Sequence, residues 1–245
     1  MKLIITGASG LVATELLRQS LRTREITQVI ALARKTVSAP SGVSPADAAK
    51  LKSVVLDDYE RYPDDVRSQL AGADACIWTV AVTPTKAQSY AFDEVTRICQ
   101  TSTLAGIRAM VEAGPARPFR FLYMSGQNAE RDQSKKPLLL PAYFKMRGET
   151  ENQLLAFAAA QEPAGSVEMC VVKPGIVTGH LSGLMSVMMG VLLGLGIFKK
   201  VGIQELVAAM LQQVRDGGFE TETLENDDLI RIGQKALASI AEGAK

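Results

Sequence analysis

The chain has 245 residues, 47% of them hydrophobic and 22% charged, which are ordinary values for a folded protein and exclude wholesale disorder. Lys and Arg number 27 and Asp and Glu 26, so the net charge of +1 supplies no basic field to attract nucleic acid. The 3 cysteines form no CxxC pair and there is 1 histidine, His180, which argues against a disulfide scaffold and a histidine-rich metal site. We therefore expect a cytoplasmic protein without a metal ion or a nucleic-acid partner.

Short apolar runs alternate along the chain with longer amphipathic segments. The apolar runs, hydrophobic on both faces like buried parallel strands, lie at residues 3–6, 28–32, 53–56, 75–79, 119–124 and 167–172. The predicted helices lie at residues 10–22, 64–71, 89–113, 142–160 and 203–214, with a last one from Asn226. This alternation predicts an α/β fold with a doubly wound, Rossmann-type parallel sheet. No linker interrupts it, so we expect one domain over residues 1–245, with a small C-terminal substrate-binding portion mainly at 176–245.

A glycine-rich sequence, residues 6–13 (TGASGLVA), joins the first predicted strand to the first predicted helix. In a dinucleotide-binding turn, the first glycine allows the tight turn and the second lets backbone N–H groups approach a pyrophosphate. The helix N-terminus adds partial positive charge. The residues expected to bind a dinucleotide are Gly7, Ser9, Gly10, Leu11 and Val12.

The end of the second predicted strand distinguishes NADP from NAD. NAD enzymes place an acidic residue there to bind the ribose hydroxyls. Here the strand is followed by Arg34 and Lys35, and between positions 28 and 51 the acidic residue present is Asp47, far into the loop. Arginine binds a phosphate through a planar pair of donors, whereas an acid would be repelled by it. We therefore expect NADP(H), with Arg34 and Lys35 near its 2′-phosphate.

Four further motifs resemble the short-chain dehydrogenase/reductase superfamily, in its atypical or extended branch. They are LYMS at 122–125, YFKMRGE at 143–149, VKPG at 172–175 and LENDDL at 224–229. The first three follow TGASGLVA in the order typical of the family, and the last looks like fungal proteins of the NmrA-like group. The resemblance implies an NAD(P)-binding Rossmann fold and is poor at naming a substrate.

By position, the resemblance assigns catalytic roles to Ser125, Tyr143 and Arg147. Ser125 would hydrogen-bond the carbonyl or hydroxyl of the substrate, and Tyr143 would donate or accept the proton as hydride moves to or from the nicotinamide. Residue 147, four positions after the tyrosine and on the same helix face, would hold the nicotinamide ribose and lower the tyrosine pKa. The family has lysine there, and arginine keeps the charge with a different geometry.

The resemblance also implies cofactor contacts at further strand ends, where ligands of doubly wound sheets bind. The fourth strand end would follow the adenine and ribose, the third would bind the adenine amino group, and the sixth would face the nicotinamide. These residues are Thr79, Val80 and Ala81, then Asp57, and then Lys173, Pro174, Gly175 and Ile176.

Residues 181–198 form an uncharged segment that contains Met185, Met188, Met189 and four glycines. Its length is at the lower limit for a membrane span, and its glycines weaken a spanning helix. Flexible methionines suit an adaptable apolar pocket. We favour a substrate pocket or lid, with a buried helix or homodimer contact as the alternative, and expect no membrane anchor.

The predicted function is NADPH-dependent hydride transfer to or from the carbonyl or hydroxyl of an apolar small molecule, as a ketone or aldehyde reductase or an alcohol dehydrogenase. One alternative is a redox-neutral isomerase or cyclase that uses the same pocket and Tyr143. The other is an NADP-sensing regulator of the NmrA-like kind without turnover.

Overall fold

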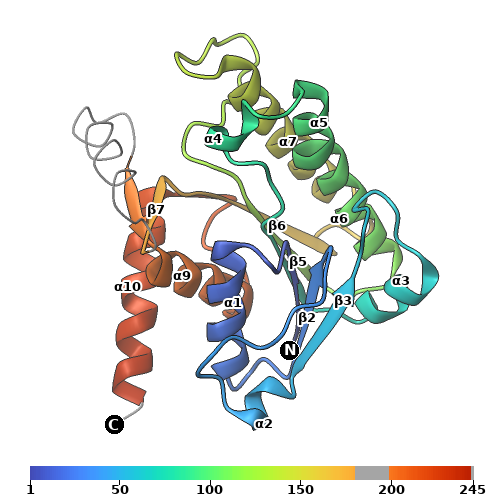
Figure 1. The fold of residues 1–245 in the computed structure, drawn as a ribbon, viewed down its shortest axis with the longest axis vertical. Helices are drawn as coiled ribbons and strands as arrows, with labels where there is room; N and C mark the ends of the chain where they lie inside the picture. Colours follow the sequence, from blue (N-terminus) through green and yellow to red (C-terminus); the bar gives the residue numbers. More distant parts are fainter. Residues whose placement is uncertain (180–198, 244–245) are drawn as a thin grey trace.

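The computed structural model describes residues 1–179 and 199–243, which build an α/β fold on a seven-stranded parallel sheet (Figure 1). The strand order is β3-β2-β1-β4-β5-β6-β9. The chain therefore runs outward from β1 in one direction and then crosses over to continue from β4 in the other, which confirms the predicted doubly wound, Rossmann-type class. The strands are β1 (Lys2–Thr6), β2 (Gln28–Ala33), β3 (Leu51–Val55), β4 (Ala75–Trp78), β5 (Phe119–Met124), β6 (Val167–Lys173) and β9 (Thr223–Glu225).

Helices cover both faces of this sheet, because successive residues of each central strand point to opposite sides. Leu3 and Ile5 of β1 pack with α1, α9 and α10 in one hydrophobic cluster, and Ile4 packs with α3, α6 and α7 in the other. Figure 1 shows the two groups of helices on either side of the strands. The helices are α1 (Leu11–Arg22), α2 (Pro45–Ala48), α3 (Asp64–Leu70), α4 (Pro84–Ala87), α5 (Phe92–Thr96), α6 (Ser102–Glu112), α7 (Pro141–Ala159), α9 (Ile203–Arg215) and α10 (Asn226–Gly243).

The helix predicted over residues 89–113 begins later than expected. A short helix, α4, comes first, and α5 begins at Phe92 with Asp93 and Glu94 in its first turn, where carboxylates suit the helix dipole. A π-helical stretch, Arg97–Thr101, then joins α5 to α6. The prediction of one regular helix is therefore wrong at its start and in its middle.

Strand β9 was not predicted, because it is three residues long and buries a single side chain, Leu224. It pairs parallel to β6 and leads directly into α10. Residues 36–50, between β2 and β3, contain one helical turn, α2, which begins at Pro45 behind the capping hydroxyl of Ser44.

A second, two-stranded parallel sheet, β7 (Ile176–Thr178) and β8 (Lys200–Gly202), lies beside the main one. Asn226, which is 1% exposed, connects it to α10. Its Oδ1 accepts a hydrogen bond from the Gly175 N–H (2.9 Å), and its Nδ2 donates to the Lys200 carbonyl (3.1 Å). One buried amide thus joins the turn after β6, strand β8 and the start of α10.

Among residues 1–179 and 199–243, no helix has the length and apolar character needed to cross a membrane. The prediction of a pocket or lid at residues 181–198 falls outside the described residues.

Candidate functional site

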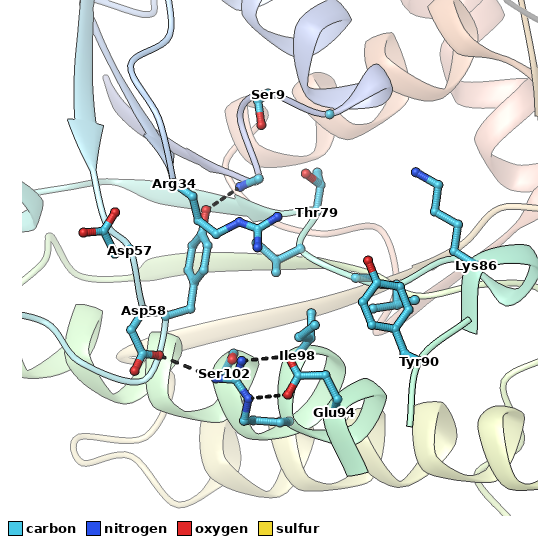
Figure 2. A pocket seen from close by; sticks show the side chains of 17 residues that line it. Ser9, Arg34, Asp57, Asp58, Thr79, Lys86, Tyr90, Glu94, Ile98 and Ser102 are labelled. Carbon is cyan, nitrogen blue, oxygen red and sulfur yellow. Dashed lines mark hydrogen bonds and ion pairs between the residues drawn. The ribbon is translucent and has the colours of Figure 1, made fainter. Parts of the chain in front are cut away.

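A first cavity, of about 660 Å³, lies at the carboxyl edge of the sheet beside the β1–α1 turn (Figure 2). Four adjacent strands contribute the residues that follow their C-terminal ends. These residues are Gly7 after β1, Arg34 after β2, Asp57 after β3, and Thr79, Val80 and Ala81 after β4. Ser9 and Gly10 of the glycine-rich turn complete this wall. The structure therefore brings together most of the residues predicted to bind the dinucleotide.

The glycine-rich turn is tightly built against β4. Gly7 has φ +64°, and a Cβ atom there would lie 2.9 Å from Thr79 Oγ1, so the position suits glycine alone. The Gly10 N–H donates to the Gly7 carbonyl at 2.8 Å. No side chain caps the N-terminus of α1, so its first N–H groups stay available to an anion.

Tyr59, which was not predicted, holds the glycine-rich turn through hydrogen bonds to two backbone groups. Its hydroxyl accepts a hydrogen bond from the Gly7 N–H (3.2 Å) and donates one to the Leu32 carbonyl of β2 (2.9 Å). Burial raises the pKa of Tyr59 to about 12, so the hydroxyl keeps its proton at neutral pH and remains a donor. Tyr59 therefore ties the glycine-rich turn to the end of β2.

The two cations predicted at the 2′-phosphate differ in position. Arg34 lines the first cavity, and Figure 2 shows its guanidinium reaching into it toward Thr79. It forms no ion pair with any other residue in the described parts of the chain. Lys35 is exposed and lines neither of the two cavities. Asp57 is exposed and faces the same cavity as Arg34.

An ion-pair network that was not predicted forms the wall opposite the glycine-rich turn. Arg97 of the π-helical stretch donates to Glu94 and to Glu60, each at 2.8 Å, and lies 3.9 Å from Asp58. In Figure 2, dashed lines mark the ion pairs of the Asp58 and Glu94 carboxylates along the base of the cavity. With three carboxylates around it, Arg97 is a less available phosphate ligand than Arg34.

A second cavity, of about 600 Å³, continues from the first toward β5 and β6. Gly10, Thr79, Ala81 and Lys86 line both cavities, which are therefore adjacent. Leu11 and Val12, predicted to bind cofactor, lie on the second cavity, as do the three predicted catalytic residues Ser125, Tyr143 and Arg147. The structure thus places the catalytic candidates next to the dinucleotide cavity.

Tyr143 and Arg147 lie one turn apart on α7. The Tyr143 hydroxyl donates to the Val82 carbonyl at 2.8 Å. Burial raises the pKa of Tyr143 to about 12, although the Arg147 charge acts to lower it. The expected influence of residue 147 on the tyrosine pKa is present, but burial outweighs it.

Arg147 is a buried cation with a free donor. Its side chain is covered, with the residue 3% exposed, and its guanidinium lies 5.0 Å from the centre of the Tyr123 ring. Nη2 donates to the Met124 carbonyl at 2.8 Å, whereas Nη1 has no partner among the described residues. A buried donor of this kind needs an acceptor, and a ribose hydroxyl in the second cavity would supply one.

Ser125 follows β5 and lines the second cavity, but its hydroxyl already has an internal partner. It donates to Oε1 of Glu151, a fully buried carboxylate one turn beyond Arg147 on α7. Glu151 was not predicted. Its spacing of four residues from Arg147 and eight from Tyr143, on one helix face, is the signal that could have identified it.

Of the residues at the end of β6, some line the second cavity and one points into the protein interior. Pro174, Gly175 and Ile176 line the second cavity, as predicted for the nicotinamide side. Lys173 lines neither cavity. It is buried, its Nζ donates to the Ala129 carbonyl at 2.8 Å, and it lies 3.6 Å from Glu151. A buried ammonium group requires such partners, so its side chain points inward rather than toward a cofactor.

The model of the NAD(P)H-binding family matches residues 7–178 of this chain, well over half of its length. The chain is also similar to "Protein fmp52, mitochondrial" of Aspergillus clavatus, with 26% identity over 176 residues. The matched region makes up 72% of this chain and 66% of that protein, just under two thirds of the relative.

Solved structures of nucleotide-sugar enzymes and of a reductase share the fold. MoeE5 in complex with UDP-glucuronic acid and NAD superposes with a TM-score of 0.66 and 19% identity, covering 92% of this chain and 76% of that chain. The UDP-glucose 4-epimerase of Thermotoga maritima superposes with a TM-score of 0.65 and 13% identity, covering 96% of this chain and 82% of that chain. The PhqB reductase domain of Penicillium fellutanum superposes with a TM-score of 0.67 and 18% identity, covering 93% of this chain and 67% of that chain. The chain has the Rossmann-type fold that these solved structures share, and it belongs to the NAD(P)H-binding family.

Proposed function

We propose that the protein is an NADP(H)-dependent oxidoreductase that transfers hydride to or from the carbonyl or hydroxyl carbon of an apolar small molecule. The observation that carries the proposal is the adjacency of the two cavities, because it puts Ser125, Tyr143 and Arg147 where a dinucleotide on the glycine-rich turn would end. Bound NADPH would supply the hydride. The chain supplies the proton and holds the substrate.

Two side chains of α7 divide this work. The Tyr143 hydroxyl keeps its proton through the neutral range, because burial raises its pKa to about 12, and it is the proton donor to a substrate carbonyl. To do so it exchanges the Val82 carbonyl for the substrate oxygen as its acceptor. Arg147 uses its free Nη1 for a ribose hydroxyl, while Nη2 stays fixed on the backbone of β5.

The preference for NADP(H) rests on Arg34. Its exposed guanidinium faces the first cavity without an internal counter-ion among the described residues, and it binds a 2′-phosphate through two charge-assisted hydrogen bonds. We expect calorimetry to show NADPH binding at least about tenfold more tightly than NADH, and Arg34→Ala to remove most of the difference. Lys35→Ala is the matched control, since it removes a neighbouring charge that lines neither cavity. Equal affinities for the two cofactors would refute the NADP assignment.

The substrate class follows from the second cavity. Most of its exposed wall is apolar and includes Leu11, Val12, Met124, Phe144 and Ile176, beside polar side chains such as Ser125, Gln127 and Asn128. Such a lining binds an apolar skeleton and leaves orientation to a small number of polar contacts.

The test of turnover is NADPH oxidation, followed at 340 nm, with a panel of apolar aldehydes and ketones. We expect oxidation with at least one of them and a loss of about 10²-fold in Tyr143→Phe. Tight NADPH binding without oxidation would favour the sensor, and a product of unchanged oxidation state would favour an isomerase.

A further inference from the structure

The proposed reaction leaves a buried carboxylate unexplained. Glu151 is fully covered by protein and lies directly behind Ser125, away from the second cavity. Burying a carboxylate is costly unless several donors compensate it. Two cations do so here: Arg131 donates from Nε at 2.7 Å, and the Lys173 ammonium lies 3.6 Å away.

The two oxygens of Glu151 face different partners. Both cations contact Oε2, and the Ser125 hydroxyl contacts Oε1. Because an ionised carboxylate accepts hydrogen bonds and donates none, the shared proton must come from Ser125. The Ser125 oxygen therefore presents lone pairs to the cavity, and its proton is directed away from it.

We propose that Glu151 fixes Ser125 as a hydrogen-bond acceptor, so that the site recognises a ligand oxygen or nitrogen that carries a proton. This rests on the proposed function and narrows its ligand class to hydroxyl-bearing molecules at this position. Glu151 is a positioning residue that acts through Ser125. It narrows the sequence-based expectation that Ser125 hydrogen-bonds the carbonyl or the hydroxyl of the substrate.

The assignment has a direct consequence for the two sides of the reaction. An alcohol donates to Ser125 and accepts from Tyr143, so both of its hydrogen-bonding functions are satisfied. A carbonyl oxygen has no proton, so it opposes the lone pairs of Ser125 and relies on Tyr143 alone. The alcohol is therefore the better ligand, whichever direction the enzyme runs.

The test compares the binding of 1-phenylethanol and acetophenone, which share a skeleton and differ in the hydrogen on oxygen. The full-length protein is loaded with 1,4,5,6-tetrahydro-NADP, which occupies the cofactor site and donates no hydride, and affinities are measured by ligand-observed NMR. We expect the alcohol to bind about fivefold more tightly, the value of one net hydrogen bond, and Ser125→Ala to abolish the preference.

The Glu151→Gln variant tests the role of Glu151 more directly than Ser125→Ala does. Because the two cations require an acceptor, the amide oxygen takes the Oε2 position and the amide nitrogen faces Ser125. That nitrogen donates to Ser125, so the serine proton turns toward the cavity and the preference shifts to the ketone. Glu149→Gln, the same change on α7 at a residue that lines neither cavity, is the control and should keep the alcohol preference.

The outcomes separate this proposal from the proposed function. Failure of the cofactor analogue to bind refutes the NADP assignment, and the ligand comparison is then made on the unloaded protein. A ketone preference in the wild type, a ratio unchanged in Glu151→Gln, or no binding of either probe overturns the role of Glu151. A purely structural Glu151 would lower thermal stability when changed to Gln and leave the ratio as it was.

Discussion

Gly148 lies in the middle of α7, where two opposing effects act on its replacement by alanine. Helix propensity favours alanine over glycine by about 1 kcal/mol in a helix interior. However, a Cβ at this position would lie 1.8 Å from the Glu130 carbonyl oxygen and 2.6 Å from the Arg131 nitrogen. Both are backbone atoms, so no side-chain rotation relieves the overlap.

The steric effect should win. The helix and the loop must separate by roughly 1.5 Å or more to restore van der Waals contact. That movement strains the hydrogen bonds from the Glu130 N–H to the Phe144 carbonyl (3.0 Å) and from Asn152 to the Arg131 carbonyl (3.0 Å). Overpacking typically costs about 1–3 kcal/mol, and backbone overlap lies at the upper end of that range. We expect a net loss of about 2 kcal/mol in the free energy of unfolding.

Thermal unfolding followed by circular dichroism measures this loss. For a chain of this size, about 2 kcal/mol corresponds to a melting temperature about 4–8 °C lower. Gly126→Ala is the matched control, because a Cβ there has no neighbour within 4 Å, and its melting temperature should stay close to that of the wild type. A Gly148→Ala protein as stable as the wild type, or more stable, would refute the reasoning from close approach.

Three further predictions concern the site. Gly7→Ala should weaken NADPH binding at least about tenfold by calorimetry, since the residue would be strained at φ +64° and would press on Thr79; unchanged affinity contradicts this. Tyr59→Phe should lower the free energy of unfolding by about 1–3 kcal/mol in urea, because its two backbone partners lose their hydrogen bonds; a neutral effect would contradict the supporting role. The raised pKa values of Tyr59 and Tyr143, each about 12, predict that the contribution of these two residues to stability is constant below about pH 10 and is lost as pH rises toward 12, because the unfolded chain loses these protons first; urea titrations between pH 10 and 12, compared with a Tyr59→Phe protein, would show it, and a flat profile there would not fit.

The central strands could be predicted from the sequence because they are buried on both faces. Leu3, Ile4 and Ile5 are each fully covered, and a run of this kind reads as a strand without knowledge of its neighbours. Strand β9 could not be predicted from the sequence, because it forms by pairing with β6 and its own residues do not have a strand pattern.

The site divides in the same way. Residues that follow strand ends, such as Gly7 and Thr79, could be predicted because parallel strands end at one edge of the sheet. Tyr59 could not, because its role arises from contacts 27 and 52 positions away in the sequence. The sequence also could not show how deeply Tyr143 is buried, because burial depends on tertiary packing. Only the folded chain shows that burial raises the pKa of Tyr143 more than the charge of Arg147 lowers it.

The buried amide of Asn226 imposes an order on folding during synthesis. A chain growing from its N-terminus has strands β1 to β6 available once residue 173 has been made, so the glycine-rich turn can form early. The Gly175 N–H, however, gains its acceptor, Asn226 Oδ1, about fifty residues later, and a half-buried amide without a partner is unfavourable. The first cavity is therefore complete several seconds before the end of the second that Gly175 lines, at ordinary rates of translation. A nascent chain in that interval would have a dinucleotide-binding turn but an unfinished reaction chamber.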